Sequence, residues 1–142
     1  MRFSNSLTIG RSPEDVFNFL AAFENVPQWN YAIVETHKTS EGPVGMGTTY
    51  RQIRSLPSRG EETFRVIEFD PDRRLAIHGD LGSFKGTLTY ELEPLRGGTR
   101  LTNSAELEAH GLMKLAAPIA AGKVREAVAA NLERLKEILE QG

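Results

Sequence analysis

Apolar and polar residues alternate along most of the chain, and this pattern predicts a series of β-strands. Residues 3–9 alternate in this way, as expected for a strand with one buried face. Residues 84–93 show the most regular alternation. Further strands are predicted at residues 32–38, 48–56, 62–69, 75–80 and around 101–107. The strand at 75–80 is expected to be short and broken around Gly79 and Gly82, because glycine weakens a strand interior.

The C-terminal part of the chain has a different period, which predicts one long amphipathic helix over residues 112–140. Alanines such as Ala116 and Ala120 dominate the apolar stripe in its first half. Leucines dominate the second half, namely Leu132, Leu135 and Leu139. We therefore expect the second half to pack tightly and the first half to leave space beneath it. Pro118 lies within the helix and predicts a kink or a restart there.

Two short helices are expected after the first strand. Ser12 is a suitable N-cap, Pro13 suits the first helical position, and an apolar-faced helix follows them. Pro27 interrupts this helix, and a second helical turn is predicted over residues 27–30. The order is thus one strand, two short helices, six further strands and a long helix.

This order predicts an α+β fold. An antiparallel sheet with one solvated face needs a cover on its other face, and a single long helix can supply that cover. We expect a curved antiparallel sheet of about seven strands wrapped around the C-terminal helix. A length of 142 residues suits a single domain over residues 1–142.

The composition excludes several classes of function. The net charge is −2 without a long basic block, which argues against a nucleic-acid partner. There are no cysteines, and this excludes disulfides, thiol catalysis and thiolate metal sites. The histidines lie far apart, and no nucleotide-binding or metalloprotease motif is present. We therefore expect neither a metal ion nor a cofactor.

The sequence also bears on location. The first residues lack the apolar run of a signal peptide, and no segment has the length and apolarity of a membrane span. We expect a cytoplasmic protein without stable membrane insertion. Leu115 and Ile119 lie off the main apolar stripe of the predicted helix, and a homodimer contact through them is left open.

The predicted layout resembles the helix-grip superfamily, which includes START-related lipid-transfer domains, the birch-pollen-allergen fold and the bacterial polyketide cyclase/dehydrase family. The segments that carry this resemblance are residues 12–17, 26–30, 68–75 and 97–102. The resemblance implies that a small hydrophobic or amphipathic molecule binds in a cavity between the sheet and the C-terminal helix. Only some members of the superfamily catalyse a reaction.

Nine residues are candidates for contact with such a ligand: Trp29, Tyr31, Arg51, Phe84, Leu88, Tyr90, Asn103, Ala116 and Ala120. Asn103 falls in phase with apolar neighbours, so its amide points inward and needs a partner. That partner is either a ligand or another protein group, such as Tyr90 on the adjacent strand. Trp29 and Tyr31 stand where the short helices meet the sheet, either at an entrance or as a staple between helices.

One of two arginines should also point inward. Arg51 and Arg54 lie on opposite faces of one strand, and the mixed pattern around them does not decide which is inside. An inward arginine would favour an anionic ligand head. His78 and Asp80 share a strand face, either as a proton-transfer pair or as part of the solvated face, and the pattern favours the solvated face.

Three classes of function follow. The first is a ligand-binding protein, which we expect on the basis of the resemblance. The second is a cyclase or dehydratase acting on an aromatic or polyketide-like substrate, with Tyr90, Asn103, His78 or an inward arginine as acid, base or carbonyl polariser. The third is a helper module that docks a protein partner and has a vestigial cavity.

Overall fold

The computed structural model describes residues 1–111 and 113–142, without the side chains of Met113 and of residues 116–118. Its elements follow the predicted order. They are β1 (Arg2–Ile9), α1 (Pro13–Ala21), the 3-10 helix η1 (Phe23–Asn25), α2 (Val26–Trp29), β2 (Ile33–Lys38), β3 (Thr49–Arg54), β4 (Gly60–Asp70), β5 (Arg74–Leu81), β6 (Phe84–Leu95), β7 (Gly98–Ala109) and α3 (Met113–Gln141).

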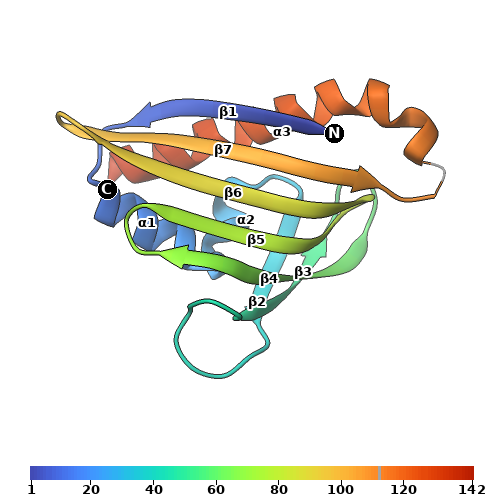
Figure 1. Ribbon diagram of the computed structural model, residues 1–142, viewed down its shortest axis with the longest axis horizontal. Helices are drawn as coiled ribbons and strands as arrows, with labels where there is room; N and C mark the ends of the chain where they lie inside the picture. Colours follow the sequence, from blue (N-terminus) through green and yellow to red (C-terminus); the bar gives the residue numbers. More distant parts are fainter. Residues whose placement is uncertain (112) are drawn as a thin grey trace.

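The strands form one antiparallel sheet of seven strands in the order β1-β7-β6-β5-β4-β3-β2. Strands that follow one another from β2 to β7 are neighbours, and β1 pairs with β7. The three α-helices lie on one side of the sheet, and α3 runs along β1 and β7 (Figure 1). We call the covered side the concave face. The predicted α+β fold and the curved seven-stranded sheet are therefore confirmed.

A pair of facing glycines allows neighbouring strands to approach closely. Gly79 of β5 pairs with Gly86 of β6. A Cβ atom on Gly86 would lie 1.9 Å from the backbone oxygen of Glu106 in β7, and one on Gly79 would lie 2.3 Å from that of Thr63 in β4. Only glycine permits the strands on either side to come so close. The prediction that Gly79 breaks its strand was wrong, because β5 continues through it to Leu81.

Hydrogen bonds of Arg11 hold the start of α1 against the end of α3. Ser12 caps α1 by accepting a hydrogen bond from the Asp15 backbone N–H at 3.2 Å, as predicted. Arg11 donates from Nη1 to the backbone carbonyl of Leu139 at 2.6 Å, and its Nη2 pairs with Asp15 at 2.9 Å. Arg11 thereby occupies one of the free carbonyls at the end of α3. Figure 1 accordingly shows the C-terminus beside α1.

Helix α3 packs differently along its length. Leu132, Leu135 and Leu139 are buried in the main core cluster, and this confirms the tight packing expected for the second half. The first half contributes Ala120 and Val124, which are only partly buried, to a second and smaller cluster. No helix in the described part of the chain is long and apolar enough to cross a membrane.

Two predictions about α3 fall on the part that is not described. Ala116 and Pro118 are among the residues whose side chains lie outside the described structure. The kink at Pro118 and the placement of Ala116 next to a ligand therefore stay predictions. Helix α3 is assigned as a single element from Met113 to Gln141, so no restart separates two helices.

Candidate functional site on the concave face

Apolar side chains cover the part of the concave face that lies beneath the first half of α3. Phe84 and Leu107 are buried in the smaller cluster, and Ala120 and Val124 pack against it from the helix. Leu88 lies at the centre of the sheet, between Ile77 of β5 and Ala105 of β7, and contacts both clusters. It nevertheless stays partly exposed. The helix therefore does not seal the centre of this face.

A row of polar side chains crosses the neighbouring strands β1, β7 and β6. Asn5 pairs with Asn103, and Asn103 pairs with Tyr90, so all three point to the concave face. Asn103 is only 1% exposed, and its Nδ2 donates to the backbone carbonyl of Thr89 at 3.4 Å. Its Oδ1 is buried and has no partner among the described residues. Such an unpaired buried oxygen is rare in folded proteins and calls for an explanation.

Tyr90 is buried beneath α2. The Trp29 ring of α2 meets the Tyr90 ring edge to face, with centroids 6.5 Å apart. Both residues are buried, and this contact packs α2 against β6. Burial raises the pKa of the Tyr90 hydroxyl, because the charged phenolate would be poorly solvated. Tyr90 is therefore a neutral hydrogen-bonding group at physiological pH.

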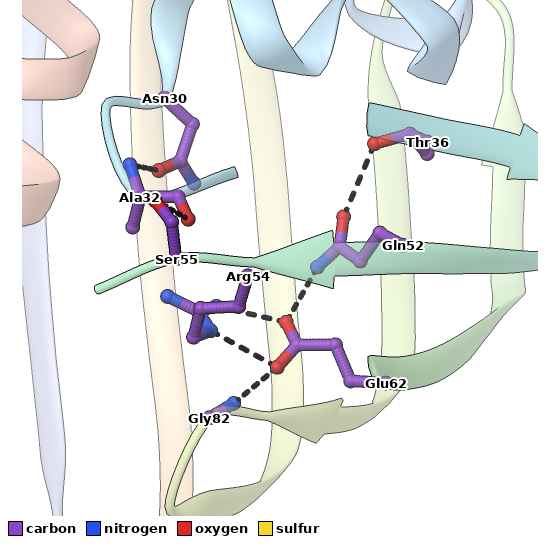
Figure 2. A network of polar contacts seen from close by, with 8 residues as sticks. All are labelled: Asn30, Ala32, Thr36, Gln52, Arg54, Ser55, Glu62 and Gly82. Atoms are coloured by element: carbon purple, nitrogen blue, oxygen red, sulfur yellow. Dashed lines mark hydrogen bonds and ion pairs between the residues drawn. The ribbon is translucent and has the colours of Figure 1, made fainter. Parts of the chain in front are cut away.

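A buried carboxylate organises a second polar group at one end of this face. Figure 2 shows Glu62 of β4 surrounded by donors from β3 and from the turn between β5 and β6. Its Oε1 accepts from Gln52 Nε2 at 2.6 Å and from Arg54 Nη2 at 2.9 Å. Its Oε2 accepts from Arg54 Nε at 3.0 Å and from the Gly82 backbone N–H at 2.7 Å. Thr36 extends the group by donating to Gln52 Oε1 at 3.4 Å. We call these five residues the Glu62 network.

The arginine that points inward is Arg54. It follows Tyr50 and Gln52 at alternate positions of β3, and its side chain is 17% exposed. Arg51 points to the outer face, where it pairs with Glu61 at 3.2 Å. Arg51 therefore does not line the concave face, although the sequence made it a ligand candidate. The alternation alone could not decide between the two faces, because polar residues occupy both.

Two other candidates also lie away from the concave face. Tyr31 is 65% exposed on the loop after α2. His78 lies on the outer face of β5, where its Nδ1 is 2.9 Å from the Thr87 hydroxyl oxygen. Asp80, on the same face, is exposed. The pair therefore belongs to the solvated face, the interpretation that the sequence pattern favoured.

The described residues were also compared with what a metal ion, a surface ligand or a second subunit would need. Among the described residues, no group of three or more histidine or acidic side chains is arranged to hold a metal ion. Two surface grooves of about 310 and 690 Å3 are lined mainly by charged and polar residues near the turn before β5. None of the eight candidates whose side chains are described lines either groove. Leu115 and Ile119 are exposed, and the homodimer contact stays a prediction.

Arg54 is the one member of the Glu62 network that sequence reasoning identified as a candidate for the site. Glu62 falls in phase with Phe64 and Val66 on β4, and Gln52 falls in phase with Tyr50 on β3. This phase was the available signal. A glutamate near the start of a strand is normally solvated, so its burial could not be expected without knowing that Arg54 and Gly82 surround it.

Comparisons with known proteins agree with this architecture. Residues 1–140 match the family described as polyketide cyclase / dehydrase and lipid transport. Uncharacterised proteins from Mycobacterium tuberculosis and Mycobacterium bovis are 30% identical over 106 residues. This match covers 70% of the chain but only 61% of the length of those relatives.

Several solved structures share the fold. A START superfamily protein from Mycobacterium smegmatis is 20% identical, with a TM-score of 0.78 over 97% of this chain and 98% of that one. An aromatase/cyclase from Streptomyces sp. R1128 is 15% identical, with a TM-score of 0.79 over 99% and 94%. Ara h 8.0201 is 14% identical, with a TM-score of 0.78 over 100% and 99%. With its helix-grip fold, the chain belongs to the polyketide cyclase/dehydrase and lipid transport family.

Proposed function

We propose that the protein binds a small hydrophobic or amphipathic molecule between the concave face and the first half of α3. The observation that carries this proposal is the partial exposure of Leu88 at the centre of the sheet. An apolar side chain in that position is normally covered, and leaving it open sacrifices burial energy of about 25 cal/mol per Å2. A bound apolar molecule would recover that energy.

The polar groups of the concave face fit the same proposal. Pockets for small molecules are mostly apolar and contain a few polar groups that orient the ligand. Here those groups are Asn103, Tyr90 and the inward-facing Arg54. Phe84, Leu88 and Ala120 would supply the apolar wall.

The test is a paired measurement on α3 with a neutral fluorescent dye of the naphthalene class. We expect the dye to bind wild type saturably. Ala120→Leu should abolish binding while stability stays the same or rises, because the leucine fills space that is otherwise open. Ala130 is exposed on the same helix, so Ala130→Leu serves as the control and should leave dye binding intact.

A different result is expected if no space lies beneath the first half of α3. If Ala120 sits in a closed interface, Ala120→Leu overpacks it and costs about 1–3 kcal/mol of stability. That loss, together with unchanged dye binding, would show that the first half of α3 is an ordinary packed helix. Absence of dye binding to wild type would leave the docking module with a vestigial cavity as the better hypothesis.

An enzyme acting in the same space is the second candidate. The observation in its favour is the cross-strand pair of Tyr90 and Asn103, because a neutral hydroxyl beside an amide can polarise a substrate carbonyl. A dehydratase, or a cyclase whose aldol product loses water on aromatisation, would release one water from an aromatic or polyketide-like substrate. Native mass spectrometry separates the two hypotheses. A carrier returns its retained molecule unchanged, whereas such an enzyme returns a molecule lighter by one water.

A further inference from the structure

Arg54 is held in place in a way that leaves one of its nitrogens unused. Two of its nitrogens, Nε and Nη2, bond to the two carboxylate oxygens of Glu62 at 3.0 and 2.9 Å. The third nitrogen, Nη1, has no hydrogen-bond acceptor in the described part of the chain. Figure 2 shows one nitrogen of the guanidinium turned away from Glu62, without a contact. The fork geometry of the pair therefore fixes the direction in which Nη1 points.

The residues around Arg54 keep the guanidinium in this position. Glu62 is itself fixed by Gln52 Nε2 and by the Gly82 backbone N–H. Gly82 has a φ of +70° in the turn between β5 and β6, and a Cβ there would lie 3.2 Å from Arg54 Nε. Glycine thus allows the turn to lie against the guanidinium. An exposed ion pair without such support would be mobile and weak.

The charge of the network selects the kind of group that Nη1 can receive. Glu62 is 5% exposed and cancels the charge of Arg54 at contact distance. A carboxylate or phosphate bound to Nη1 would bring a second anion close to this buried one, and it would lose its own hydration. A neutral carbonyl oxygen accepts the same hydrogen bond without either cost.

We infer that Arg54 is a specificity-determining residue that binds a neutral carbonyl oxygen of the ligand, and that Glu62 is the positioning residue that orients it. This inference rests on the proposed function, because it assigns the ligand to the class of apolar molecules carrying a ketone, ester or amide. It replaces the anionic head that an isolated inward arginine would favour.

Three naphthalene probes test the inference: 2-acetylnaphthalene carries a carbonyl, 2-ethylnaphthalene lacks it, and 2-naphthoate is anionic. For wild type we expect the ketone to bind more tightly than the hydrocarbon by roughly ten- to a hundred-fold, the range for a hydrogen bond to a charged group. The naphthoate should bind less tightly than the ketone. In Arg54→Met the preference for the ketone should disappear, while the hydrocarbon binds as before.

Two further variants keep the result interpretable. Arg51→Met removes the arginine of the outer face of the same strand and should retain the full preference. Arg54→Met combined with Glu62→Leu replaces the ion pair by apolar groups, and it should bind the hydrocarbon without any preference even if the single variant fails to fold. A ketone preference that survives in the double variant, or a wild type that binds naphthoate most tightly, would overturn the inference. Equal binding of ketone and hydrocarbon by wild type would do the same, whereas failure of all three probes would refute the proposed function itself.

Discussion

Two ion pairs on the same two strands should differ widely in what they contribute to stability. Arg54 and Glu62 face the concave side, with side chains 17% and 5% exposed. Arg51 and Glu61 face the solvent, with side chains 46% and 54% exposed. Both pairs join β3 to β4, so the comparison holds strand, residue type and sequence neighbourhood nearly constant. We predict that Arg54→Met is strongly destabilising and that Arg51→Met is nearly neutral.

The magnitudes follow from what each change leaves behind. Arg54→Met leaves a buried carboxylate with the Gln52 and Gly82 donors only, and breaking such a pair costs about 3–5 kcal/mol. Arg51→Met leaves a solvated carboxylate and costs about 0–1 kcal/mol. At roughly 3 °C per kcal/mol for a chain of this size, the melting temperature should fall by roughly 10–15 °C in the first case and at most about 3 °C in the second.

The double variant Arg54→Met/Glu62→Leu distinguishes the cost of an unpaired buried charge from the cost of losing the ion pair itself. It removes both charges, and it leaves unpaired only the Gln52 amide and the Gly82 N–H, at a cost of about 1 kcal/mol each. It should therefore be more stable than either single variant. Urea unfolding followed by circular dichroism gives the free energies of wild type, Arg54→Met, Glu62→Leu and the double variant, and that of Arg51→Met for comparison. Equal losses for Arg54→Met and Arg51→Met, or additive losses within the buried pair, would refute the assignment of Glu62 to a desolvated network.

Two further predictions concern the sheet. Gly86→Ala should destabilise the protein strongly, because its Cβ would collide with the Glu106 carbonyl. Gly122→Ala, at an exposed position of α3, should instead raise the free energy of unfolding by about 1 kcal/mol. Thermal melts of both variants check this. Burial, and to a smaller extent the charge of Glu24, raise the pKa of Tyr50 from 10.0 to about 12, so the folded state holds this proton more tightly than the unfolded state. The protonated hydroxyl of Tyr50 makes its full contribution to the free energy of unfolding below pH 10. That contribution should be lost as the pH rises towards 12, because the unfolded chain releases the proton first. Tyr50→Phe should reduce that loss in urea titrations at alkaline pH, and an identical alkaline profile for both proteins would contradict the assignment.

Local patterns were sufficient for the elements, because alternation and helical spacing are properties of neighbouring residues. Local patterns were insufficient for features that depend on how one strand pairs with its neighbour. The pairing of Gly79 with Gly86 depends on the register between β5 and β6, so the sequence suggested a broken strand where β5 is continuous. A bulge near Val34 of β2 likewise places both Val34 and Glu35 on the solvated side, which no regular alternation predicts.

The same limit applied to the candidate site. Asn103 and Tyr90 could be assigned to the inside, because their strands alternate without interruption. Arg51 and Arg54 could not be assigned, because the residue that decides between them, Glu62, lies on another strand. Buried charge is a property of the assembled sheet, and a charged side chain in sequence is more often solvated.

The stability cycle and the probe experiment together decide why the Glu62 network exists. Replacing a buried ion pair by apolar groups is often neutral or stabilising, so a fold alone has little reason to keep one. If the double variant Arg54→Met/Glu62→Leu stays folded and still binds 2-ethylnaphthalene, the charges are dispensable for both the sheet and the apolar wall. Loss of the ketone preference in that same variant would then assign the network to ligand selection. A double variant that loses its fold while the probes bind wild type without preference would assign it to the structure instead.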